Sequence, residues 1–165
     1  MIRRLGPGDS EELRELGRRF KERVPSLEAA EAFIADPRHV VLVASELDGF
    51  LLAYVMARID RRMAVFLYEI EVAEGARRRG IARALVEEAR QIGREEDAFE
   101  MYVLTESDNT AANRLYEATD RCGRGPLPLA RSRARMPEPK ASGRAGEGGS
   151  RGKPAVSPLR ASKRR

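Results

Sequence analysis

The sequence predicts a mixed α/β fold within residues 1–119. Hydrophobic patterns of helical and strand period alternate there in the order βααβββαβα, which is typical of a sheet layered with helices. All nine Phe and Tyr residues of the 165-residue chain also lie in this part. A chain of this length suits one domain, and the aromatic residues place its core before residue 120.

The N-terminal part of the sequence predicts one short strand and two helices. The strand covers residues 1–5 and ends at the glycine and proline turn of residues 6–8. Leucine and phenylalanine then recur at helical spacing over residues 10–23, which indicates an amphipathic helix. A second apolar pattern predicts a helix that starts near residue 27 and ends at Asp36-Pro37.

Three consecutive strands are predicted in the middle of the chain. They cover residues 39–45, 50–59 and 63–73, and each is rich in β-branched or aromatic residues. Asp48-Gly49, between the first two strands, is the common sequence signal for a tight hairpin. The middle of the chain is therefore expected to form an antiparallel meander.

A helix, a strand and a second helix complete the predicted fold. The first helix begins after Gly80, the strand covers residues 99–105, and Ser107-Asp108-Asn109 caps the last helix. The apolar face of the helix after Gly80 carries Ile81, Leu85, Ala89 and Ile92.

The strand, turn and helix over residues 68–86 form the segment most informative about chemistry. Free backbone N–H groups and the positive end of the dipole at a helix N-terminus bind anions. Gly80 allows a ligand to approach the backbone closely, and the arginines at 77–79 add fixed positive charge suited to phosphates. The alternative is a basic surface turn that only precedes a helix.

Two motifs in the chain resemble those of one enzyme family. They are Arg77-Arg78-Arg79-Gly80-Ile81-Ala82 and the helix pattern Asn109-x-x-Ala112-x-x-Leu115-Tyr116. Both are similar to signatures of the GNAT superfamily of acetyl-CoA-dependent N-acetyltransferases, and the resemblance covers about residues 2–119. It implies a mixed, mainly antiparallel sheet flanked by helices, with acetyl-CoA as co-substrate and no metal.

The resemblance also implies a role for each matched residue. Backbone amides between Arg78 and Arg83 would hold the pyrophosphate of coenzyme A, and the strand around residues 70–72 would pair with the pantetheine arm. Tyr116 would protonate the departing thiolate; its alternative is an aromatic residue of the core. The residues expected to bind the cofactor are Ile70, Glu71, Val72, Arg77, Arg78, Arg79, Gly80, Ile81, Ala82, Arg83, Asn109 and Tyr116.

Glu69 and Glu71 are the candidates for the base that an acceptor ammonium requires. They lie two residues apart on one strand, so both project to the same face. Carboxylates held close together bind a proton more readily, which suits a general base. Glu69 is the first choice from the resemblance, and Glu71 would share its proton or bind a substrate cation. The alternative is ordinary solvent-facing charge.

The acceptor is expected to be a primary amine of a small cationic molecule. Residues 68–73 and the Leu5-Gly6-Pro7 opening are most similar to aminoglycoside 3-N-acetyltransferases of the AAC(3)-I type. This resemblance makes an aminoglycoside the favoured substrate. The alternatives are a protein N-terminal or lysine acetyltransferase, and a catalytically impaired domain with a basic binding tail.

The family resemblance ends at about Thr119, and residues 120–165 are predicted to form a disordered basic tail. Of these 46 residues, 34 are Arg, Gly, Pro, Ala or Ser, and the net charge is +10. The C-terminal strand or strands of the fold are therefore expected to be missing. One hypothesis is a frameshifted reading of a GC-rich gene; the other is a selected tail that binds a polyanion.

Composition narrows the remaining function classes. Residues 1–119 carry 18 basic and 23 acidic side chains, so nucleic acid is expected to bind only through the tail. One cysteine, Cys122, and one histidine, His39, argue against a metal site. The longest apolar stretch, 40–57, is interrupted by charges, so no transmembrane helix is expected. The N-terminus lacks the apolar core of a signal peptide. A cytoplasmic protein is expected, with a homodimer left open.

Overall fold

A six-stranded mixed sheet runs through the described part of the chain, in the order β1-β2-β3-β4-β5-β6. The structure is a computed structural model that describes residues 1–106, 108–122 and 129–133. The first four strands pair antiparallel, whereas β4–β5 and β5–β6 pair parallel. The strands are β1 (Ile2–Arg4), β2 (His39–Ala44), β3 (Gly49–Ala57), β4 (Met63–Val72), β5 (Ala98–Thr105) and β6 (Leu129–Arg133).

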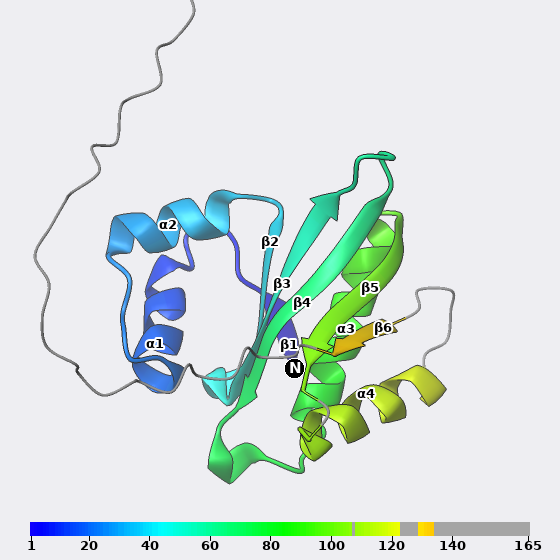
Figure 1. Cartoon of the computed structure of the whole chain (residues 1–165). Coiled ribbons are helices and arrows are strands. Elements are labelled where there is room, and N and C mark those ends of the chain that lie inside the picture. The colour runs from blue at the N-terminus through cyan, green and yellow to red at the C-terminus, as the bar shows by residue number, and fades with distance from the viewer. Residues whose placement is uncertain (107, 123–128, 134–165) are drawn as a thin grey trace, which may run out of the picture. The chain divides into compact units, whose positions relative to one another are not determined.

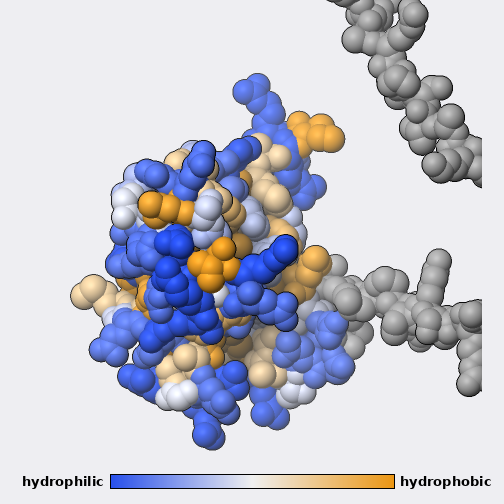
Figure 2. All heavy atoms as spheres, turned by 90° about the vertical axis from the view of Figure 1, so that its left-hand side faces the viewer, coloured by the Kyte–Doolittle hydropathy of each residue, from blue (hydrophilic) through white to orange (hydrophobic). Residues whose placement is uncertain are grey.

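Helices cover both faces of this sheet, which confirms the predicted mixed α/β fold (Figure 1). One core, centred on Leu51, Leu67 and Leu85, lies under α3 and α4, and a second core around Leu16 and Phe50 lies under α1 and α2. The outer surface on the α1 and α2 side is mainly hydrophilic, with small separate hydrophobic groups (Figure 2). The helices are α1 (Ser10–Phe20), α2 (Leu27–Ala35), α3 (Ile81–Glu95) and α4 (Thr110–Cys122).

The β2–β3 hairpin forms at the predicted place, but by a different turn. Residues Ser45–Leu47 form a 3₁₀ turn, in which Glu46 and Leu47 have positive φ values of 59° and 55°. The Arg19 guanidinium donates to both of their carbonyl oxygens, at 2.5 and 3.0 Å. A distant side chain thus holds a turn that local sequence signals do not indicate.

Strand β4 loses one of its two partner strands halfway along its length. Its pairing with β3 is interrupted between Leu52 and Ala53, which leaves Tyr68 without a partner residue as a β-bulge. Its pairing with β5 ends at Leu67. From Glu69 to Val72, β4 therefore pairs only with β3. The opposite edge of β4, which β5 covers up to Leu67, is free over these residues.

The C-terminal part of the fold extends beyond the predicted limit. Helix α4 continues to Cys122, and β6 comes next at Leu129–Arg133, inside the segment predicted as a disordered tail. The expectation that no strand lies beyond Thr119 was therefore wrong. An open strand edge pairs with extended backbone whatever its side chains, so β6 needs no alternating apolar pattern. The rest of the predicted tail, 123–128 and 134–165, lies outside the described residues.

One smaller difference concerns helix length. Helix α1 ends at Phe20, three residues before the predicted limit, because the backbone at Lys21 turns to an extended conformation. Among the described helices, none combines the length and the apolar character needed to cross a membrane.

Candidate active site

The turn before α3 has the geometry of an anion site. Gly80 is the N-cap residue of α3 with φ of 81°, a left-handed conformation that favours glycine. The first hydrogen bond within the helix runs from the Ala84 amide to the Gly80 carbonyl at 3.0 Å. The amides of residues 81–83 lie before this bond, so they have no acceptor within the helix. A Cβ built on Gly80 would meet no atom within 4 Å, so the space beside the turn is open.

The three arginines of this turn are all exposed, but they are anchored differently. Arg77 donates through Nε to the Val72 carbonyl at 3.3 Å, which ties the turn to the end of β4. Arg79 lies 3.5 Å from the Asp48 carboxylate. Arg78 has a positive φ of 62°, a conformation that arginine adopts only where the surrounding turn imposes it. The exposed Arg83 lies in the first turn of α3.

A cavity of about 430 Å³ adjoins this turn. Its walls come from the end of β4 beyond its pairing with β5, the turn at Arg77, the start of α3 and the start of α4. Six residues predicted to bind the cofactor meet there, although they lie up to 39 residues apart in sequence. The lining residues are Ile70, Glu71, Val72, Arg77, Ala82, Asn109, Ala111, Ala112 and Leu115.

Asn109 has a structural role at this cavity as well. Its side-chain oxygen accepts a hydrogen bond from the Ala112 amide at 3.1 Å, which caps the start of α4. The cap fixes the N-terminal turn of α4 against the cavity. The predicted capping run thus acts through Asn109, while Ser107 lies outside the described residues.

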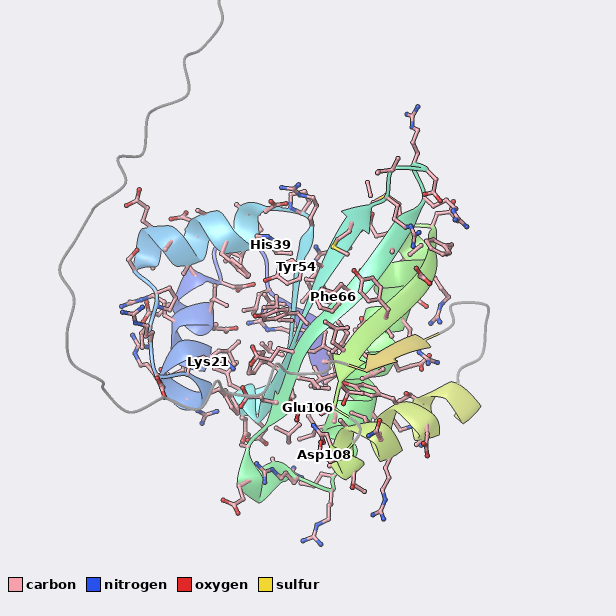
Figure 3. The ribbon with its side chains drawn as sticks, viewed as in Figure 1. Lys21, His39, Tyr54, Phe66, Glu106 and Asp108 are labelled. Atoms are coloured by element: carbon pink, nitrogen blue, oxygen red, sulfur yellow. The ribbon has the colours of Figure 1, made fainter. Side chains whose placement is uncertain are left out.

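Glu69 and Glu71 project from β4 toward α1, as their spacing predicts. The Nζ atom of Lys21, the residue labelled beside α1 in Figure 3, donates a hydrogen bond to each carboxylate. It also lies 5.1 Å from the centre of the Phe50 ring, within the range of a cation–π contact. Burial by itself would lower the pKa of Lys21, but the hydrogen bonds to both glutamates raise that pKa above its ordinary value.

Sequence reasoning missed Lys21 entirely. It lies 48 residues before Glu69, one residue beyond the end of α1. It is the single lysine of residues 1–119, but no local pattern links it to the two glutamates. Only the packing of α1 on the sheet brings the ammonium to the two carboxylates.

A second cavity, of about 390 Å³, lies on the α1 side of the same strand end. Glu71, Val72 and Arg77 line both cavities. The end of β4 therefore separates the two cavities. Such an arrangement suits a reaction in which two substrates bind on either side of one strand. The other residues of this second cavity are Arg19, Phe20, Asp48, Ala73 and Glu74.

Tyr116 lies apart from the two glutamates. Its side chain is only 2% exposed and belongs to the core under α3 and α4, and its neighbour Leu115, not Tyr116, lines the larger cavity. Burial raises the pKa of the Tyr116 phenol, so the group keeps its proton at neutral pH. The structure thus places Tyr116 as an aromatic residue of the core, and its role as a proton donor stays a prediction.

A row of aromatic rings crosses the sheet on the face that bears the glutamates, and the sequence reasoning did not identify it. The Phe66 ring stacks on Tyr102 with 4.9 Å between ring centres and meets Tyr68 edge-on at 5.9 Å, and Tyr68 meets Tyr54 edge-on at 5.7 Å. Phe66 and Tyr54 are labelled in Figure 3. Tyr68 is 59% exposed. Burial, followed by the nearby Tyr68 and Glu69, raises the pKa of Tyr54, which links this row to the carboxylates.

Comparison with known proteins identifies the family. The family model described as the acetyltransferase (GNAT) family matches residues 10–120, and the chain belongs to this family. Membership supports an acyltransferase and implies acetyl-CoA as the donor. Among curated protein sequences, none matches the chain.

Solved structures share the fold at low sequence identity. An aminoglycoside acetyltransferase from an uncultured soil metagenomic sample, in complex with sisomicin, is 20% identical with a TM-score of 0.67 over 76% of this chain and 90% of its own. The ribosomal-protein-alanine N-acetyltransferase of Brucella melitensis biovar Abortus 2308 is 24% identical, with a TM-score of 0.58 over 72% and 89%. NAA60 of Arabidopsis thaliana, in complex with acetyl-CoA, is 23% identical, with a TM-score of 0.57 over 75% and 87%.

Proposed function

We propose that the chain transfers the acetyl group of acetyl-CoA to a primary amine of a small cationic substrate, with an aminoglycoside as the favoured class. The observation that carries this proposal is the end of β4. It separates a cavity beside an anion-binding turn from a second cavity, and it carries two glutamates next to them.

The residues of the larger cavity fit acetyl-CoA. The amides of residues 81–83 and the positive end of α3 suit the pyrophosphate, and the open space at Gly80 lets it approach. The strand edge over residues 70–72, left free where β4 leaves β5, suits the amides of the pantetheine arm. When bound, acetyl-CoA supplies a thioester that an amine can attack.

The chemical step then needs one base and one acid. The acceptor ammonium loses a proton to Glu69, directly or through water, and its free lone pair attacks the thioester carbonyl in a ternary complex. Glu71 binds a cationic group of the substrate. Tyr116, which burial keeps protonated, supplies a proton to the departing thiolate.

A protein N-terminus or lysine is the second candidate acceptor. It is favoured by the structures from Brucella and Arabidopsis, which match this chain at slightly higher identity, although with lower TM-scores, than the aminoglycoside enzyme. The acidic charge of residues 1–119 is the reason to prefer a small polycation.

The decisive experiment combines binding with turnover. Acetyl-CoA is titrated calorimetrically, and thiol release is then measured with aminoglycosides, linear polyamines, monoamines and peptides with free N-termini. We expect saturable acetyl-CoA binding and fastest thiol release with the polycationic acceptors. Preference for peptides would establish the second candidate instead. Binding without release by any amine would show a catalytically impaired domain.

A further inference from the structure

We propose that Lys21 determines acceptor specificity: its ammonium occupies the place of the acceptor's ammonium, and only acceptors with two or more cationic groups displace it efficiently. This inference rests on the proposed function, since it assigns Glu69 and Glu71 to the acceptor side of that site. The contacts of Lys21 are those that an acceptor amine would need. Its Nζ donates to both carboxylates and lies against the face of the Phe50 ring.

The charges around Lys21 make this exchange selective. A monoamine that displaces Lys21 replaces one ammonium by another, so the number of charge-assisted hydrogen bonds stays the same. A polycation brings further positive groups. The adjoining cavity, which Glu71 also lines, offers them the carboxylates of Glu74 and of Asp48. Asp48 already lies 3.5 Å from Arg79, and the guanidiniums of Arg19 and Arg77 line the same cavity. The polycation therefore gains contacts that offset the loss of the Lys21 pairs.

Displacement of Lys21 is sterically feasible. Its side chain is 36% exposed, so the ammonium reaches water by rotating away from the strand. Its stem also lines an apolar cavity of about 320 Å³ between α1 and α2, next to Leu13, Pro25 and Phe33. A methionine at this position has apolar surroundings for its side chain, so Lys21→Met is expected to fold.

The test compares three chains. Lys21→Met removes the competing ammonium and keeps the length of the side chain. Arg23→Met is the matched control, because Arg23 lines the same apolar cavity and is exposed, and the described residues place no carboxylate on it. Both variants and the parent chain are assayed for kcat/KM with butylamine, 1,4-diaminobutane and an aminoglycoside.

In Lys21→Met, kcat/KM for butylamine is expected to rise about three- to tenfold. This is the effect expected from the loss of two partly exposed ion pairs, those of Lys21 with Glu69 and Glu71. The kcat/KM for the aminoglycoside should change much less. Arg23→Met should leave the ratio of kcat/KM for the aminoglycoside to kcat/KM for butylamine unchanged. An equal fall for all three amines would overturn the inference, because Lys21 would then only position the glutamates.

Calorimetry without acetyl-CoA gives a result that does not depend on turnover. Butylamine should bind Lys21→Met more tightly than the parent chain. Equal affinity for the two chains overturns the inference even if amines are acetylated. Tighter binding together with no acetylation upholds the role of Lys21 and refutes the proposed function instead.

Discussion

Gly80 joins backbone conformation and charge at a single residue. Its φ of 81° allows the turn, and its missing side chain leaves the space where the pyrophosphate is proposed to lie. In Gly80→Asp, a carboxylate enters that space and repels the phosphates. Charge-assisted hydrogen bonds contribute about 1.5–3 kcal/mol, so affinity for acetyl-CoA should fall about ten- to hundredfold.

Isothermal calorimetry measures this loss, and Gly75→Asp is the control. Gly75 lies in the same turn region with open space around it, but its φ is not positive. The control should bind acetyl-CoA nearly as the parent chain does. Equal affinity of all three chains would refute the phosphate-loop assignment.

The choice between Glu69 and Glu71 is tested by pH dependence. Glu69→Gln should lower kcat most at neutral pH, because an aliphatic ammonium titrates near about pH 10 and needs a base below it. As the pH rises toward that value, more acceptor is already neutral and the defect should shrink. Glu71→Gln should instead raise KM at all pH values. The opposite assignment holds if Glu71→Gln shows the shrinking defect.

Tyr116 is tested by two substitutions with different expectations. Tyr116→Phe keeps the ring in the core and removes the proton donor, so kcat should fall about 10²- to 10⁴-fold while acetyl-CoA affinity and Tm change little. Tyr116→Leu should lower Tm as well, because it leaves unfilled space in a packed core. Unchanged kcat in Tyr116→Phe would leave Tyr116 as a core residue only.

Among single residues, the sequence predicts the role of those that have a local signal, and it misses those whose role depends on packing. Gly80 and Asn109 were identifiable because a turn and a cap have recognisable neighbours. Lys21 was not, since its partners lie on a strand far along the chain. Nor does the pattern around Tyr116 distinguish a buried proton donor from a core ring.

At the scale of elements, β3, β4 and α3 approach one another closely at Gly49. A Cβ on this residue would lie 2.9 Å from the Glu71 carbonyl, 3.1 Å from Val72 Cγ2 and 3.2 Å from Ile81 Cγ2. Gly49→Ala must therefore push the end of β4 away from the start of α3. We expect a loss of about 1–3 kcal/mol in unfolding free energy, together with weaker acetyl-CoA binding.

Urea unfolding and calorimetry measure these two effects. Gly75→Ala is the matched control, because a Cβ there meets nothing within 4 Å. Normal stability and affinity in Gly49→Ala would show that the strand end adjusts freely, so its position would not fix the two cavities.

The elements were largely predictable, and their pairing was not. Hydrophobic period and turn residues locate β4 and the start of α3 to within about a residue, because both signals are local. The bulge at Tyr68 and the separation of β4 from β5 after Leu67 depend on partner strands. These two irregularities create the free edge of β4. The feature most relevant to the proposed function is therefore one that the hydrophobic pattern of the sequence does not predict.

For the whole molecule, stability depends on how the sheet is completed after α4. In the part of the chain that the structure describes, β6 is the last element and ends at Arg133. A chain ending at residue 135 should keep the Tm and acetyl-CoA affinity of the parent. A chain ending at Cys122 loses β6, which reopens the β5 edge, so its Tm should fall.

Differential scanning calorimetry of both truncations distinguishes the two hypotheses for the C-terminus. Equal Tm values would indicate that β6 contributes nothing, as expected for an out-of-frame segment. A selected basic tail instead predicts salt-sensitive binding to a polyanion that both truncations weaken, since residues 120–165 carry a net charge of +10. Translating the gene in its other frames tests the frameshift hypothesis directly.

The aromatic row also gives the molecule an intrinsic optical signal. The chain contains no tryptophan and four tyrosines, so its near-ultraviolet fluorescence comes from tyrosine alone. Three of these four, Tyr54, Tyr68 and Tyr102, belong to the row beside the glutamates, and the fourth is sealed in the core. An acceptor that settles over the sheet changes the surroundings of most of the emitters at once. Its arrival is therefore observable by stopped-flow fluorescence on the unlabelled protein, separately from the chemical step.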